Sequence, residues 1–173
     1  GNVSNTGLMM ARLCYDLLME KGRDALAAVE RHEVTPALED VVEATIYLSG
    51  LGFENGGLAA AHAVNDGFAQ EPQAHGMYHG EKVAFGTLVQ LVLEKAPQEE
   101  LEQVLAFLRD TGLPLTLAQL GVKEIVPETL KKVAEAAVVP TQSTKNLRAD
   151  ITAQEVYDAI LEADRIGRDY LAR

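Results

Sequence analysis

Helical periodicity runs through almost all of this 173-residue chain and constrains its fold more than any other feature. In the segment 81–96, apolar side chains recur at intervals of three and four residues, as on one face of a helix: Phe85, Leu88, Val89, Val92 and Leu93. The alternating or Val/Ile-rich runs that indicate strands are nearly absent. The sequence therefore predicts an all-α bundle, with about seven to nine helices of ordinary length.

Capping signals and glycines give the expected helix boundaries. Thr35 before Pro36 predicts a helix that runs toward Gly50, and Thr152 with Glu155 forms a capping box for the last helix. The apolar run LMMARLCYDLLMEKG is expected to form a buried helix that stops at Gly22. Further helices are expected up to about Lys95, after Pro97 to Gly112, and over 128–138, with a turn at 50–57 and a loop at 138–150.

Composition excludes some partners. The formal net charge of −11 argues against a nucleic acid or an anionic membrane as partner, because both require a basic surface. No apolar run reaches the roughly 20 residues needed to span a bilayer. The single cysteine, Cys14, cannot form an intrachain disulfide; it is expected to be a buried packing residue, and a cytoplasmic location is expected.

One domain is expected. The first seven residues, GNVSNTG, lack an initiating Met and are interpreted as a cloning scar or a cut end, which leaves 8–173 as a single helical domain. A glycine-rich turn between a strand and a helix, and a G-K-[ST] phosphate loop, are both missing. A nucleotide site contained within this chain is therefore not expected.

Three of the four histidines fall within residues 57–85. His62 lies in an alanine-rich helix that can approach a neighbour closely, and His79 lies at or near a helix N-terminus, where the helix dipole favours a neutral imidazole. Neutral imidazole is the form that binds metal ions. Two packed helices would bring both rings together, although a core role for His62 stays open.

A catalytic zinc usually has three protein ligands, so two histidines are not a complete site. Within the chain, the candidates for a third ligand are His75, Asp66 and Glu54, and none has a recognised ligand spacing. His32 is expected to end a helix at the surface.

Two motifs carry a family resemblance. The segment VTPALEDVVEATIYLSGLGFENGGLAAAHAV, followed by YHGEKVAFGTLVQLVLE, resembles the C-terminal helical domain of bacterial glycerol dehydrogenases. These enzymes are members of the iron-containing (group III) alcohol dehydrogenases, which have the dehydroquinate-synthase-like fold. The resemblance continues through GLPLTLAQLGV to VYDAILEADRIGRDYL.

The resemblance implies a metal-dependent oxidation of glycerol to dihydroxyacetone with NAD. His62 and His79 match the two histidines that bind the catalytic zinc or iron in the family, and Phe53 matches an aromatic residue that lines the polyol pocket. A homo-oligomer is also implied. In such enzymes the metal acts as a Lewis acid toward the alcohol oxygen.

The sequence departs from the family pattern in three ways. The upstream aspartate that is the family's third metal ligand is missing, and so is the nucleotide-binding domain. Asn65-Asp66-Gly67 stands where the family commonly has His-Asn-Gly. We therefore expect the chain to be inactive alone. A stand-alone helical interaction or scaffold module derived from that domain is the alternative function, and a metal module complete in itself is a third.

Overall fold

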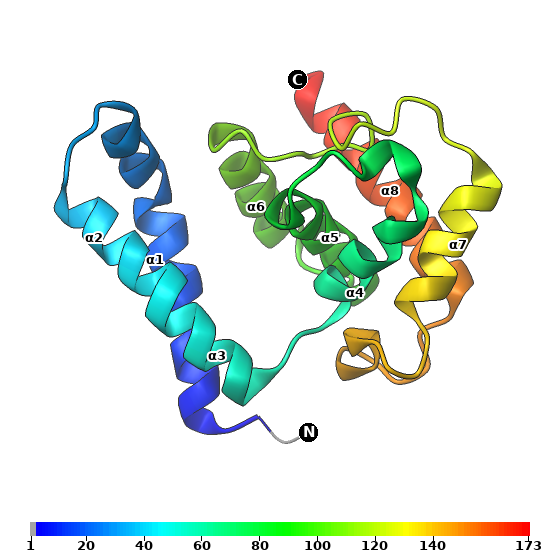
Figure 1. Cartoon of the computed structure of the whole chain (residues 1–173), viewed down its shortest axis with the longest axis horizontal. Coiled ribbons are helices and arrows are strands. Elements are labelled where there is room, and N and C mark those ends of the chain that lie inside the picture. The colour runs from blue at the N-terminus through cyan, green and yellow to red at the C-terminus, as the bar shows by residue number, and fades with distance from the viewer. Residues whose placement is uncertain (1–2) are drawn as a thin grey trace. The chain divides into compact units, whose positions relative to one another are not determined.

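A computed structural model describes residues 3–173 of the chain (Figure 1). The described residues form α-helices, short 3₁₀-helices and one π-helix, with no strand, so the all-α prediction is confirmed. None of the helices between residues 3 and 173 combines the length and apolar character needed to cross a bilayer. The elements group into two compact units, Gly1–Gly57 and Leu58–Arg173, which are called unit 1 and unit 2.

Unit 1 is a helical hairpin. Its long arm is α1 (Asn5–Glu30), and its other arm is the succession of α2 (Pro36–Glu43), the π-helix η1 (Ala44–Leu48) and α3 (Ser49–Gly56). α1 packs along all three elements of the second arm, as the blue and cyan ribbons of Figure 1 show. Thr35 begins the second arm as predicted, because its hydroxyl accepts a hydrogen bond from the backbone N–H of Leu38.

Two predictions for α1 are wrong. The helix does not stop at Gly22 but continues to Glu30, because the following turns bury Ala25 and Ala28 against the second arm. An internal glycine costs a helix only about 1 kcal/mol, which such packing offsets. The helix is also not buried on most sides, since Leu8 and Met9 are exposed. Cys14 is half-buried rather than buried, and its thiol donates to the carbonyl oxygen of Ala44 at 3.4 Å.

The predicted turn at 50–57 is also wrong. Residues 50–56 belong to α3, and the chain leaves the helix only at Gly57, whose φ of 74° is in the left-handed region that favours glycine. Small residues suit this helix because it lies close to α1: a Cβ on Gly52 would be 3.6 Å from the backbone of Ala11. Close helix packing has therefore prevailed over the turn preference of the glycines.

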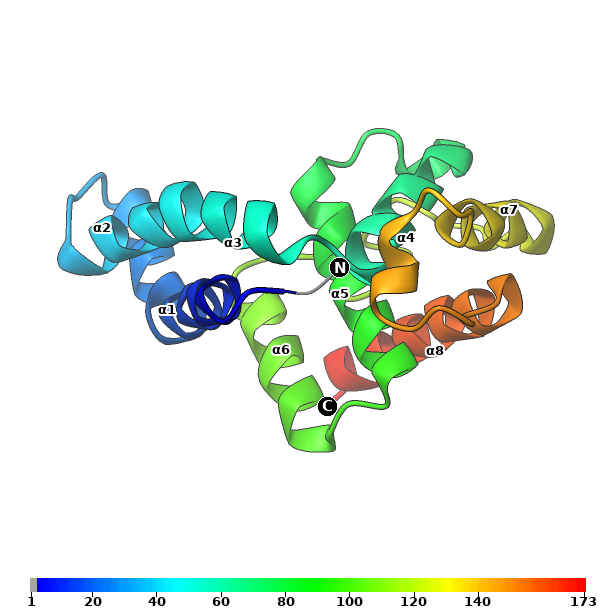
Figure 2. The same ribbon diagram turned by 90° about the horizontal axis from the view of Figure 1, so that it is seen from below.

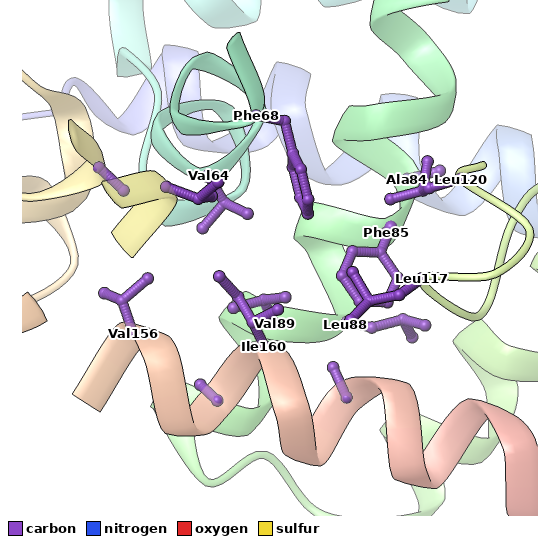
Figure 3. Close-up of a cluster of buried hydrophobic side chains, with 14 of the residues drawn as sticks. Val64, Phe68, Ala84, Phe85, Leu88, Val89, Leu117, Leu120, Val156 and Ile160 are labelled. Atoms are coloured by element: carbon purple, nitrogen blue, oxygen red, sulfur yellow. The ribbon is translucent and has the colours of Figure 1, made fainter. Parts of the chain in front are cut away.

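Unit 2 contains the main hydrophobic core. Its elements are α4 (Ala60–Gly67), η2 (Phe68–Gln70), η3 (Pro72–Ala74), α5 (His79–Glu94), α6 (Gln98–Asp110), α7 (Pro127–Ala137), η4 (Ser143–Asn146) and α8 (Ala153–Leu171). α5 is central, with α4, α6 and α8 packed around it (Figure 2). Phe68 and Phe85 meet edge to face with ring centroids 6.1 Å apart, and Val156 and Ile160 of α8 point toward Val64 and Val89 (Figure 3).

Most boundaries predicted for unit 2 are confirmed. α5 ends at a left-handed Lys95, α6 and α7 lie where expected, and Thr152 forms the capping box of α8 with Glu155. The segment 138–150 contains only the short η4. The two units are defined by the contacts within each of them, which does not test whether 8–173 is a single domain. That domain therefore stays a prediction. Of the segment 1–7, residues 1–2 lie outside the described residues, Ser4 caps α1, and residues 5–7 belong to α1.

Candidate metal-ligating histidine pair

His62 and His79 lie side by side in unit 2. His62 is on α4 and His79 is the first residue of α5, and their ring centroids are 5.5 Å apart with the ring planes tilted by 48°. Seventeen positions separate them in the sequence, so only the packing of the two helices brings the imidazoles together.

The rings can approach because α4 and α5 cross with almost no side chain between their backbones. A Cβ added to Gly86 of α5 would lie 2.4 Å from the carbonyl oxygen of Ala61, closer than real atoms come. The amide of Ala61 also donates to the side-chain oxygen of Gln90 at 3.0 Å. The small residues of GGLAAAHAV therefore permit a close crossing next to His62.

His79 is held by the N-terminus of α5. The preceding amide, that of Tyr78, donates to a carboxylate oxygen of Glu81 at 2.7 Å, which fixes the first turn of the helix. His79 itself is exposed, so one side of the pair is open to solvent.

The surroundings of His62 favour its neutral form. Burial lowers the pKa of His62 below its ordinary value, and the nearby His79 lowers it further, while the carboxylate of Asp66 acts in the opposite direction. An imidazole that stays neutral near pH 7 has a ring nitrogen free to bind a metal ion.

The spacing of the pair fits two ligands of one metal ion. With metal–nitrogen bonds of about 2.0–2.1 Å and tetrahedral angles, two imidazoles on one zinc have ring centres about 5 Å apart. The observed 5.5 Å is close to that value. Within residues 3–173, however, no three His, Cys, Asp or Glu side chains cluster closely enough to hold a metal ion. The described residues fit part of a donor set, not a whole one.

The other proposed ligands have different partners. His75 is exposed in the loop, and its Nε2 lies 3.0 Å from the carbonyl oxygen of Ala69. The carboxylate of Asp66 accepts hydrogen bonds from the amide groups of Asn65 and Gln142. Glu54 is on α3 in unit 1. His32 lies at the surface just after the end of α1, as predicted, and its φ of 56° is left-handed.

Asn65, where the family pattern has histidine, is one turn after His62 on α4. It is buried, and its Oδ1 is a buried side-chain oxygen without a hydrogen-bond partner, while its amide nitrogen donates to Asp66 at 3.0 Å. A buried acceptor without a partner is costly and uncommon in a folded protein. The Oδ1 of Asn65 is therefore a hydrogen-bond acceptor without a donor, one helical turn from His62.

Phe53, the predicted substrate-pocket residue, lies on α3 in unit 1 and is half exposed. Its role stays a prediction. Ser143 and Asn146 hold the backbone immediately before α4, a role that was not predicted from the sequence. The available signal was the run of five polar residues, QSTKN, shortly after the helix expected to end near Val138.

Comparisons with known proteins agree with this fold. No family model matches the chain. It is 54% identical over 171 residues to a glycerol dehydrogenase of Escherichia coli O6:H1, an alignment that covers 99% of the chain and 47% of the relative. The crystal structure of a probable glycerol dehydrogenase from Sinorhizobium meliloti matches with a TM-score of 0.92 at 44% identity, over 96% of this chain and 47% of that one.

The glycerol dehydrogenase structure from Schizosaccharomyces pombe matches with a TM-score of 0.94 at 40% identity, over 98% of this chain and 43% of that chain. The chain spans about half the length of the curated relatives it matches. In sequence and in fold, it corresponds to the C-terminal helical domain of the glycerol dehydrogenases.

Proposed function

We propose that this chain is the metal-binding helical part of an NAD-dependent glycerol dehydrogenase, an oxidoreductase that converts glycerol to dihydroxyacetone. One observation carries the proposal: the two imidazoles that the family resemblance assigns to the metal lie 5.5 Å apart on packed helices. This spacing is close to the value of about 5 Å expected for two imidazole ligands of a single zinc ion.

His62 and His79 are the ligands that the chain itself supplies. Zinc is the proposed metal, and iron fits the same ligand type because imidazole suits both. The chemistry that such an ion supplies when bound is Lewis-acid polarisation of the alcohol oxygen. Burial lowers the pKa of His62, which favours the neutral imidazole and keeps a ring nitrogen available for the metal. His79 is exposed, so the polyol can approach the pair from the solvent.

The remaining parts of the site are assigned to residues outside this chain. The third ligand is an aspartate, and the NAD site belongs to a nucleotide-binding domain. Phe53 is proposed to line the polyol pocket. Because the described residues hold no cluster of three ligand side chains, a metal module complete in itself is not supported. The scaffold module is not favoured either, since relatives up to 54% identical are named glycerol dehydrogenases.

Zinc titration by calorimetry tests the metal site. We expect weak binding to the 173-residue chain that is lost in His62→Ala and in His79→Ala. The matched control is His75→Ala, which removes an imidazole from the same stretch but from outside the pair. Tight binding that His62→Ala leaves unchanged would eliminate this site.

An activity assay tests the division of the site between two parts. The purified chain, mixed with glycerol, NAD and zinc, is expected to give no glycerol-dependent NADH, because it holds neither the third ligand nor the NAD site. Steady-state turnover by the chain alone would contradict the proposal. The same assay on the chain combined with a nucleotide-binding domain from a relative is expected to recover activity only when both histidines are present.

Self-association is proposed as well. Unit 1 exposes several large apolar side chains, among them Leu8, Met9 and Ile46. Exposed apolar surface of this kind is typical of regions that contact another protein surface. Sedimentation velocity at several concentrations is expected to show species larger than 18.7 kDa, and a strict monomer would contradict the proposal.

A further inference from the structure

The polar segment Gln142–Asn146 lies against the backbone that leads into α4. The hydroxyl of Ser143 donates to the carbonyl oxygen of Ala59 at 2.7 Å. The side-chain amide of Asn146 donates to the carbonyl oxygen of Leu58 at 2.8 Å. Gln142 adds a bond of 3.2 Å to the carboxylate of Asp66 on α4. Three side chains of this segment therefore hold the helix that carries His62.

α4 is packed against α5 and α7, but its N-terminus lacks a cap of its own. It has only eight residues, and Ala59 at its N-cap provides no side-chain hydrogen bond. Helices this short are marginal without outside contacts. Among the described residues, the side chains that hydrogen-bond to the backbone of 58–61 are Gln90 of α5, Ser143 and Asn146.

The segment is in turn fixed to α7. The buried hydroxyl of Thr144 donates to the carbonyl oxygen of Ala137, in the last turn of α7, at 2.5 Å. Lys145 donates from its Nζ to the carbonyl oxygen of Pro140 at 2.7 Å, a bond that stays within the loop. The segment thus connects a packed helix to the start of α4, three residues before His62.

We propose that Ser143 and Asn146 are positioning residues: through Leu58 and Ala59 they set α4 so that His62 faces His79. Both side chains bond to backbone oxygens that precede α4 and not to the imidazoles, so both act through α4. That the histidine pair binds a metal ion rests on the proposed function. The positioning of α4 by Ser143 and Asn146 does not. Partners that orient ligand residues commonly affect metal affinity by 10–100-fold.

The first test needs no metal. NMR of the full chain with labelled histidines is expected to show a cross-relaxation peak between the His62 and His79 rings, because their centroids are 5.5 Å apart. The Ser143→Ala/Asn146→Ala variant is expected to lose it. Lys145→Ala is the matched control, since it removes a hydrogen bond of the same segment that does not reach α4. Ser143→Thr retains a hydroxyl donor and is expected to retain the peak.

The second test uses zinc alone. Titration followed by the ring signals is expected to give a Kd about tenfold higher for the double variant than for the wild type, with Lys145→Ala unchanged. Thermal unfolding checks that each variant folds. Should the double variant fail to fold, Asn146→Ala alone carries the same comparison.

The outcomes separate the two proposals. A double variant that keeps the ring-to-ring peak overturns the positioning role, as does equal loss in Lys145→Ala or absence of the peak from the wild type. Loss confined to the double variant supports it. If the peak behaves as expected but zinc shifts neither ring in the wild type, the positioning role stands and the proposed metal site fails.

Discussion

The two units of the chain bury different kinds of side chain. The fully buried core of unit 2 is built from large apolar residues, with Phe68, Phe85 and several leucines almost inaccessible to solvent. In unit 1 the buried positions are mostly glycine and alanine, with Leu48 as the only large one among its described residues. Both units are helical, yet only unit 2 has a dense core of its own.

This difference indicates which unit can hold side chains in a fixed arrangement. Burial of large apolar side chains contributes about 25 cal/mol per Å², so unit 2 has the greater resistance to local opening. The histidine pair lies in that unit, on helices packed against its core. Phe53, by contrast, lies in the unit whose apolar side chains remain largely exposed. Matched substitutions in the two units test this difference in stability.

The largest contrast is expected between two phenylalanines. Phe85→Ala, in the core of unit 2, should lower the free energy of unfolding by about 3–5 kcal/mol, because it removes a fully buried ring and leaves a cavity. Phe53→Ala, in unit 1, should lower it by only about 1 kcal/mol, because the residue is 49% exposed and loses less buried apolar surface. Urea unfolding followed by circular dichroism measures both, and equal losses would contradict the distinction.

Two helical glycines should give effects of opposite sign. Gly86→Ala places a Cβ 2.4 Å from the Ala61 carbonyl oxygen, so it should destabilise unit 2 by about 1–3 kcal/mol. Gly50→Ala meets nothing within 4 Å and should stabilise unit 1 by about 0.5–1 kcal/mol, since alanine favours helix. If both substitutions shifted the melting temperature in the same direction, the predicted difference between the two glycines would be wrong.

Two aspartates test the role of burial in the same way. Asp164, buried on α8, accepts from the Leu117 amide at 2.8 Å, so Asp164→Ala should cost about 2 kcal/mol by leaving that amide without a partner. Asp40 pairs with Lys21 at the partly exposed surface of unit 1, and Asp40→Ala should cost less than about 1 kcal/mol. The ratio of the two losses, measured by urea unfolding, is the result to compare.

The smallest effect is a pH dependence confined to unit 2. Burial lowers the pKa of His62 in the folded chain, so the unfolded chain binds the proton more readily. The linked stability is therefore complete above the ordinary value of 6.5 and is lost as pH falls below it toward the lowered pKa. His62→Gln should reduce the loss of thermal stability between neutral and mildly acidic pH. An unchanged pH profile would contradict this linkage.

Helix starts and core faces were predictable because their signals are local. Thr35 and Thr152 cap helices through their own hydroxyl groups, and the stripe led by Phe85 contacts the core as its spacing requires. The end of α6 near Gly112 was predicted correctly, whereas the end at Gly22 and the turn at 50–57 were not, because these glycines lie in helices that pack against a neighbour. The low helix propensity of a glycine costs little free energy, and helix packing outweighed that cost at these positions.

The all-α class follows from the helical spacing of apolar residues, which is a local property of the sequence. The resemblance carried by the two quoted motifs implies that His62 and His79 are the metal ligands. Only the tertiary structure decided that His62 and His79 are neighbours, that Gly86 allows their helices to cross closely, and that Ser143 and Asn146 hold α4. Such contacts join residues far apart in the chain, and their distances are set by how whole helices pack.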